Sequence, residues 1–130
     1  MALIPSRIDA VTLAVDDLAR SVSFYRNIMG FEQITDSEAV KGFDLGTIKL
    51  DLIDKSVLLE ETYLPDFPQP PGPVTLVISV THAEVDEYMK KLEEAGVNII
   101  AAAEDKRLGP RIGYVSDPDG HMWEIGAFDD

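Results

Sequence analysis

Cysteine is absent from the chain of 130 residues, and its absence excludes disulfides, thiolate zinc sites and a cysteine nucleophile. Basic residues are few, because 11 lysines and arginines stand against 24 aspartates and glutamates, which gives a formal net charge of −13. Most of such a surface would repel nucleic acids and anionic membranes. The sequence also lacks a bilayer-length apolar run and a signal-peptide pattern. We therefore expect a cytoplasmic protein that binds neither nucleic acid nor membrane.

The remaining composition is that of an ordinary globular protein. Apolar residues make up 45% of the chain and charged residues 27%. A chain of 130 residues can bury a sizeable core without disulfides or a structural metal. The sequence therefore predicts a single domain over residues 1–130.

The expected elements occur in the same order in both halves of the chain. The first half predicts a strand, a helix and three short strands, over residues 8–15, 16–30, 31–35, 39–46 and 47–54. The second half predicts the same series, over residues 73–80, 81–96, 97–105, 111–117 and 121–128. The chain is thus expected to contain two tandem βαβββ modules, about residues 7–54 and 73–128, related by an internal repeat.

Several boundary signals support these elements. Asp16 or Asp17 is expected to cap the first helix, whereas Thr81 and Glu84 have capping-box spacing at the second. The tetrapeptide DPDG at residues 117–120 predicts a tight turn between the last two strands.

A Pro-rich connection joins the two modules. The segment ETYLPDFPQPPGP at residues 61–73 holds five of the eight prolines. Proline neither donates to a strand ladder nor fits inside a helix, so this segment is expected to be extended. It is either a simple linker or a lid beside a cavity.

Two stretches carry a family resemblance. The segments VTLAVDDLARSVSFYRNIMGFE and YVSDPDGHMWEIGAF resemble the opening and closing segments of the vicinal oxygen chelate superfamily, and the resemblance extends over nearly the whole chain. That superfamily includes glyoxalase I, extradiol dioxygenases, fosfomycin-modifying enzymes and bleomycin-sequestering resistance proteins. The resemblance implies an α+β fold in which two βαβββ modules form a curved mixed sheet. A ligand cavity would lie on its concave face and the helices outside.

The resemblance also indicates where metal ligands would stand. The two histidine positions of metal-dependent members correspond to Ala10 and Thr75, whereas the two carboxylate positions correspond to Asp51 and Glu124. Catalytic metal sites generally need three protein ligands, and zinc, iron or nickel usually takes imidazoles among them. We therefore expect no metal cofactor, although a divalent ion could be held weakly by the carboxylates.

The two histidines of the chain do not replace the missing ligands. His121 is three residues from Glu124, so on a strand the two side chains point to opposite faces. His82 falls in the first turn of the second predicted helix, where we expect an exposed residue.

Strand alternation predicts which residues line the concave face. The expected ligand-binding residues are Thr12, Asp51, Thr75, Ser79, Tyr114, Met122 and Glu124, with Ala14 and Val77 beside them. Tyr114 could stack on an aromatic ligand, whereas Trp123 alternates to the helix side and is expected in the core. Two roles remain open for Glu124, because it could bind ligand or form a structural pair with a strand neighbour such as Arg111.

These features support two functional hypotheses. The first is a metal-free protein that binds or sequesters a small molecule, preferably a cationic or amine-bearing one because the lining is acidic. The second is a glyoxalase- or dioxygenase-like enzyme, a lyase or isomerase that uses Asp51 and Glu124 with a weakly held divalent metal or as an acid/base pair. The missing histidines favour the first hypothesis.

The chain is expected to form a homodimer, because small four-stranded sheets leave strand edges and apolar surface that need cover. Two chains of charge −13 repel each other, so the contact should be apolar and should tighten as salt is added. Analytical ultracentrifugation at low and moderate ionic strength tests this prediction. A single species near 14.3 kDa in both buffers would contradict it.

Overall fold

A computed structural model of the chain describes residues 3–62, 70, 74–107 and 109–128. The chain divides into two compact units, residues 1–66 and 67–130, and each unit is described by itself. The boundary falls in the Pro-rich connection predicted over residues 61–73. Most of that connection lies outside the described residues, so its role as linker or lid stays a prediction.

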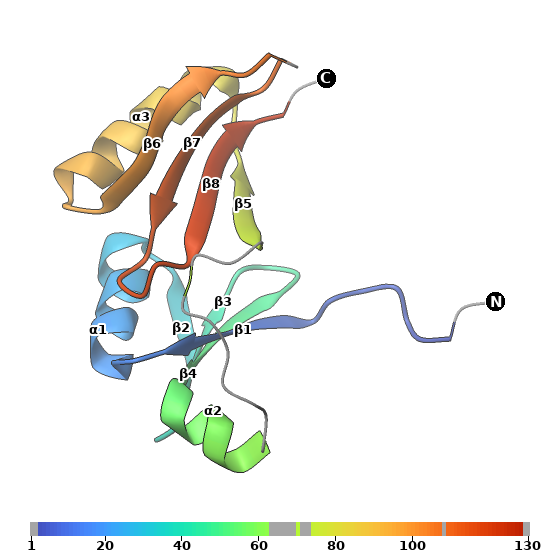
Figure 1. The fold of residues 1–130 in the computed structure, drawn as a ribbon. Coiled ribbons are helices and arrows are strands. Elements are labelled where there is room, and N and C mark those ends of the chain that lie inside the picture. Colours follow the sequence, from blue (N-terminus) through green and yellow to red (C-terminus); the bar gives the residue numbers. More distant parts are fainter. Residues whose placement is uncertain (1–2, 63–69, 71–73, 108, 129–130) are drawn as a thin grey trace. The chain divides into compact units, whose positions relative to one another are not determined.

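The first unit contains one four-stranded sheet, drawn in blue to green in Figure 1. Its elements are β1 (Ala10–Val15), α1 (Leu18–Ser23), the π-helical turn η1 (Phe24–Ile28), β2 (Glu32–Asp36), β3 (Val40–Asp44), β4 (Lys49–Asp54) and α2 (Lys55–Thr62). The strand order is β1-β4-β3-β2, with β1 and β4 parallel and the other pairs antiparallel.

The second unit repeats this plan (Figure 1). Its elements are β5 (Thr75–Ser79), α3 (His82–Glu94), β6 (Asn98–Asp105), β7 (Arg111–Ser116) and β8 (Met122–Ala127). The strand order is β5-β8-β7-β6, again with the first and last strands parallel. Each unit is thus a βαβββ module with a mixed sheet, and the predicted α+β fold class is confirmed.

Alternation along the strands separates a core face from an outer face. In the first unit, Leu13 on β1 and Leu50 and Leu52 on β4 are buried, whereas Thr12 is exposed. In the second unit, α3 packs on β6, β7 and β8 through its buried residues Val85 and Met89. We call the face of each sheet that is turned away from these buried residues the open face.

The C-terminal half of the first helix differs from the expected regular helix. Met29 donates its backbone N–H to the carbonyl of Phe24, five residues earlier, at 2.9 Å. This wider turn places the neighbouring residues Phe24 and Tyr25 both in the core, where the Tyr25 ring lies near Phe31 and Phe43. Ile28 is left 40% exposed. A strict period of 3.6 residues does not predict such a turn.

Helix α2 is absent from the sequence predictions. It begins at Lys55, directly after β4, and Asp54 accepts hydrogen bonds from the backbone and hydroxyl of Ser56 at its start. The available signal was an aspartate followed by a run of leucine and glutamate, which favour helices.

In the part of the chain that the structure describes, no helix combines the length and the apolar character needed to cross a membrane.

The predicted DPDG turn is present and sets the start of β8. The backbone N–H of Gly120 donates to the Asp117 carbonyl, and Gly120 has a φ of 97°, which a residue with a side chain rarely adopts. The buried Asp117 carboxylate accepts from the backbone N–H groups of Asp119 and His121 at 2.9 and 2.8 Å. These bonds hold the β7–β8 hairpin closed.

The capping box of α3 is also present, because Thr81 accepts from the Glu84 backbone while Glu84 accepts from Thr81. Replacing Thr81 with alanine should lower the free energy of unfolding by about 1 kcal/mol, whereas Thr81→Ser should change it little. Urea denaturation of the three proteins measures this difference. Equal losses in both variants would contradict the capping role.

The hydrogen bonds from Thr81 lower the pKa of Glu84 below its ordinary value of 4.5. A lowered carboxyl pKa stabilises the fold above the unfolded-state pKa and ceases to do so as the pH falls through the folded-state pKa. The stability difference between the parent and Thr81→Ala should therefore shrink below about pH 4.5.

Candidate functional site

On the open face of the first unit, Thr12 and Asp51 lie side by side. They are register partners in the parallel β1–β4 ladder, and Gly42 on β3 pairs with Asp51 from the other side. Thr12 is exposed and Asp51 is half-buried. The structure therefore brings together the two ligand-binding residues that were predicted for this half of the chain.

The Asp51 carboxylate has an unusual environment. Its Oδ1 is buried and has no hydrogen-bond partner among the described residues. Its Oδ2 lies 3.7 Å from the Lys49 ammonium, which forms an ion pair longer than a hydrogen bond. A Cβ placed on Gly42 would stand 2.6 Å from Oδ1, so the carboxylate occupies the space that this glycine leaves free. A buried polar atom without a partner reduces stability, and in a native structure it calls for an explanation.

The first histidine position gives no metal ligand. Ala10 pairs with Lys49 in the β1–β4 register and carries no donor atom. The positive charge beside Asp51 is the ammonium group of Lys49, whose side chain is 47% exposed. In this unit a lysine therefore stands beside the carboxylate that a metal would need.

On the open face of the second unit, a hydrogen bond joins the two predicted ligand positions. The Thr75 hydroxyl on β5 donates to Oε2 of Glu124 on β8 at 2.5 Å. These residues are 49 positions apart in the sequence and meet through the parallel β5–β8 ladder. The contact is half-buried, which strengthens a hydrogen bond to a carboxylate relative to one in water.

The suggested structural pair between Glu124 and Arg111 is absent. Arg111 donates to Asp86 at 2.8 Å and to Asp105 at 3.2 Å, and these bonds raise the pKa of the guanidinium. On the antiparallel β7–β8 ladder, Glu124 pairs with Tyr114, which is three residues from Arg111. Because side chains alternate along a strand, the side chains of Arg111 and Glu124 point to opposite faces of the sheet. Among the described residues, Glu124 pairs with Thr75.

The other predicted binding residues share this open face. Tyr114 is the cross-strand partner of Glu124, and Met122 is the register partner of Thr75. Ser79 lies at the far end of β5 and pairs with Gly126. Trp123 is only 3% exposed and lies in the core, as predicted. Five of the seven predicted residues therefore gather on one sheet, and the other two gather on the sheet of the first unit.

Two residues of the second open face were missed by sequence reasoning. The Lys106 ammonium stands 5.7 Å from the centroid of the Tyr114 ring and donates to Glu104 at 2.7 Å. The Phe128 ring lies over Gly126, because its carbons come within 2.7 Å of the place where a Cβ would stand. Continued alternation from Glu124 and Gly126 would have placed Phe128 here. Lys106 is in a loop and carried no such signal.

Neither histidine supplies a ligand. The exposed His82 ring lies 3.1 Å from Asp105, and His121 precedes β8 on the register opposite to Glu124. Within the described ranges, no three histidine, cysteine, aspartate or glutamate residues are grouped so that they could hold a metal ion. The four family positions hold a threonine hydroxyl, the Glu124 carboxylate bound to it, the Asp51 carboxylate beside Lys49, and an alanine that has no donor atom. This donor set does not fit a catalytic transition metal.

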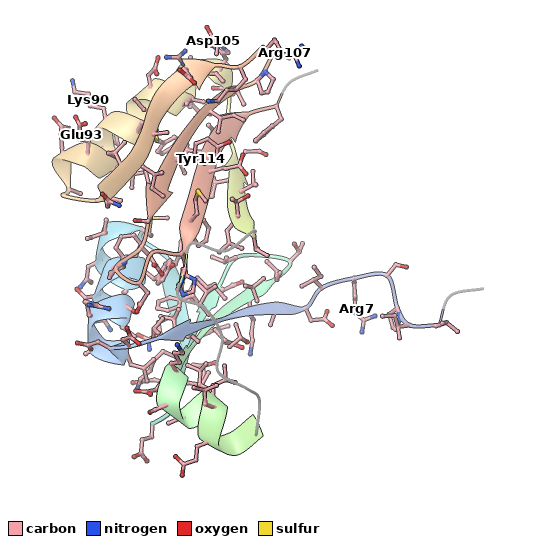
Figure 2. The ribbon with its side chains drawn as sticks, in the orientation of Figure 1. Arg7, Lys90, Glu93, Asp105, Arg107 and Tyr114 are labelled. Atoms are coloured by element: carbon pink, nitrogen blue, oxygen red, sulfur yellow. The ribbon has the colours of Figure 1, made fainter. Side chains whose placement is uncertain are left out.

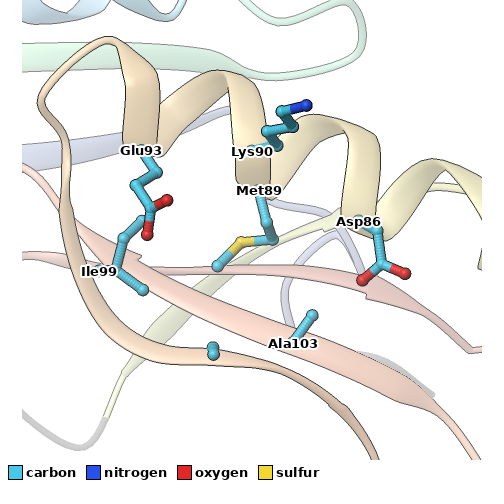
Figure 3. A pocket seen from close by; sticks show the side chains of 7 residues that line it. Asp86, Met89, Lys90, Glu93, Ile99 and Ala103 are labelled. Carbon is cyan, nitrogen blue, oxygen red and sulfur yellow. The ribbon is translucent and has the colours of Figure 1, made fainter.

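A small pocket lies on the other side of the second sheet, between α3 and the edge strand β6 (Figure 3). Its volume is about 230 Å³, and it is lined by Asp86, Met89, Lys90, Glu93, Ile99, Ala102 and Ala103. In Figure 3, Met89 points from the helix toward the strands and Lys90 points away. Figure 2 places Lys90 and Glu93 on the helix and Tyr114 over the strands. The pocket contains no predicted binding residue and is smaller than typical ligand sites of about 300 Å³ or more.

The arrangement of these positions agrees with a comparison against known families. A family model described as the Glyoxalase/Bleomycin resistance protein/Dioxygenase superfamily matches residues 7–125. The chain belongs to this superfamily. The match runs through both βαβββ modules, so the family resemblance seen in the sequence is confirmed.

Relatives in the superfamily cover nearly the whole chain. The metallothiol transferase FosB of Staphylococcus haemolyticus is 27% identical over 125 residues, which are 95% of this chain and 86% of the transferase. A lactoylglutathione lyase structure from Agrobacterium tumefaciens has a TM-score of 0.74 with 26% identity and covers 95% of each chain. A glyoxalase/bleomycin resistance protein/dioxygenase from Nocardioides has a TM-score of 0.85 with 23% identity, covering 97% of this chain and 85% of the other. This last likeness bears on the fold alone.

The contact between Asp51 and Gly42 gives a direct test of the first open face. Gly42→Ala should lower the free energy of unfolding by about 1–3 kcal/mol, because the new methyl group would overlap Oδ1 of Asp51. In an Asp51→Ala background the loss should shrink, since only Thr35, at 3.0 Å, would still crowd the methyl group. A double-mutant cycle by urea denaturation measures the coupling. The same loss in both backgrounds would show that Asp51 does not occupy this space.

Proposed function

We propose that the chain is a metal-free protein that binds a small molecule on the open face of its second unit, around Glu124. The observation that carries this proposal is the hydrogen bond from Thr75 to Glu124. Thr75 stands at the second histidine position, and its hydroxyl orients the Glu124 carboxylate and satisfies one of its oxygens without a metal. The carboxylate still has further lone pairs, because an ionised carboxylate has about four acceptor sites.

The first unit supports the same conclusion independently. Ala10 removes the other histidine, and Lys49 brings a positive charge to within 3.7 Å of Asp51. A divalent cation at Asp51 would therefore be repelled by a neighbouring ammonium. The Asp51 carboxylate thus has an in-chain cationic partner that disfavours metal binding, and Glu124 lacks a neighbouring histidine at position 75.

The charge of the site favours a cationic or amine-bearing ligand. Glu124 is half-buried, and Tyr114 beside it offers an aromatic ring face. A partly desolvated carboxylate attracts a cation more strongly than a carboxylate in open water does. The net charge of −13 would also attract a cation from solution.

An enzymatic role is the second candidate, because relatives are named as a metallothiol transferase and a lactoylglutathione lyase. In such a lyase or isomerase, Asp51 and Glu124 would bind a divalent metal weakly or act as acid and base. Metal analysis of the purified protein separates the candidates. Stoichiometric nickel, zinc, iron or manganese would overturn the metal-free proposal.

Binding and stability should respond differently to changes at the two carboxylates. Glu124→Gln should weaken binding of benzylamine about tenfold or more, because it removes the charge while keeping the shape. Asp51→Asn should leave benzylamine binding within about twofold of the parent, because Asp51 lies on the open face of the other unit. Titration calorimetry and thermal denaturation measure both effects, with the exposed Glu94→Gln as the matched control.

Loss of folding in either variant, under conditions where the parent is folded, would assign that carboxylate a structural role instead. Thr75→Val adds a further check, because it removes the hydroxyl that orients Glu124 and keeps the side-chain volume. It should weaken benzylamine binding less than Glu124→Gln does. No benzylamine binding by the parent protein would contradict the proposed ligand class.

A further inference from the structure

A second aromatic ring lies on the same open face as Glu124. Phe128 folds its ring over Gly126, which is two residues from Glu124 on the same face of β8. Gly126 pairs with Ile112, and the Phe128 ring covers this pair while staying 40% exposed itself. A residue with a side chain at position 126 would exclude the ring, so the glycine makes this arrangement possible.

The first ring already accepts a cation. The Lys106 ammonium stands over the Tyr114 ring at 5.7 Å, within the range of a cation–π interaction. Glu104 holds this ammonium with a hydrogen bond of 2.7 Å and raises the pKa of Lys106, so the group is charged near neutral pH. The lysine comes from the β6–β7 loop, and its side chain is 32% exposed. It can therefore leave the ring without disturbing the sheet.

The sheet register puts one ring across from the carboxylate and the other over the next open-face position along its strand. Tyr114 is the direct cross-strand partner of Glu124, and Gly126, under the Phe128 ring, is the next open-face residue along β8. Tyr114 and Gly126 are diagonal neighbours on the antiparallel β7–β8 ladder, a separation that aromatic side chains span. Two aromatic rings and one half-buried carboxylate thus occupy neighbouring positions on one face of the sheet.

We propose that Tyr114, Phe128 and Glu124 form a recognition site for a methylated or quaternary ammonium group, with Lys106 as a tethered cation that the ligand displaces. This inference rests on the proposed function and names its ligand class. The surfaces of the rings attract a cation through their quadrupoles, and the carboxylate supplies the opposite charge. A quaternary ammonium needs no hydrogen-bond acceptor, so it loses nothing when Thr75 already occupies one oxygen of Glu124.

Choline and its neutral isostere 3,3-dimethyl-1-butanol distinguish charge recognition from simple apolar contact. The two molecules have the same shape and differ in the charged nitrogen. The parent protein should bind choline about tenfold or more tightly than the alcohol, as measured by titration calorimetry or by chemical-shift changes in NMR. Equal affinities would overturn the proposal.

Variants test each part of the site with choline as the probe. Tyr114→Leu and Phe128→Leu should each weaken choline binding about fivefold or more, whereas Tyr114→Phe should keep it, because the ring remains. Lys106→Gln should strengthen choline binding about twofold to fivefold, because it removes the competing cation. Circular dichroism of each variant confirms the fold, and Arg107→Gln, one residue along the same exposed loop, is the matched charge control.

The outcomes separate this inference from the proposed function. If benzylamine binds in a Glu124-dependent manner but choline does not, the aromatic site is refuted and the metal-free binding function stands. If choline binds but neither leucine substitution weakens it, the rings are not the recognition surface. Stoichiometric metal in the purified protein, with no cation binding, would refute both proposals.

Discussion

In each unit the first strand pairs in parallel with the last, and this pairing decides which residues meet on the open face. The β1–β4 ladder puts Thr12 beside Asp51, and the β5–β8 ladder lets Thr75 reach Glu124. A parallel pair needs a long crossover, and here the crossover includes the helix and the two middle strands. The helix side of each sheet is buried by that crossover. The predicted binding residues lie on the side that remains open.

Each open face holds a half-buried carboxylate, and the two units satisfy it differently. Glu124 receives a short hydrogen bond from a neutral hydroxyl, which leaves its negative charge available. Asp51 has only a long ion pair with Lys49, and its buried Oδ1 has no partner among the described residues. Burial of a carboxylate without full hydrogen bonding costs stability. The second unit is therefore the better preorganised one, and this difference is why the proposed ligand site is placed there.

Much of the fold was predictable because its signals are local. Alternation in AVTLAV assigned Thr12 to the open face of β1, where it is exposed, and the spacing of Thr81 and Glu84 predicted the start of α3. The misses were also local in origin. The short helix α2 follows β4 without an intervening loop, and the π-helical turn at Phe24 breaks the regular helical period. The π-helical turn leaves no separate mark in the hydrophobic pattern, whereas the start of α2 was signalled by Asp54 and by the leucine and glutamate residues that follow it.

The repeat and the strand faces were predictable from residue identity and from periods of two and 3.6 residues, and the family resemblance assigned Ala10 and Thr75 to the two histidine positions. The side-chain partners depend on the tertiary structure. In the structure Thr75 donates to Glu124, Arg111 donates to Asp86, and the Phe128 ring lies over Gly126. The first two contacts join distant segments and depend on register, because a one-residue slip turns every side chain of a strand to the opposite face. The third joins residues two positions apart and depends on the direction in which the Phe128 side chain folds.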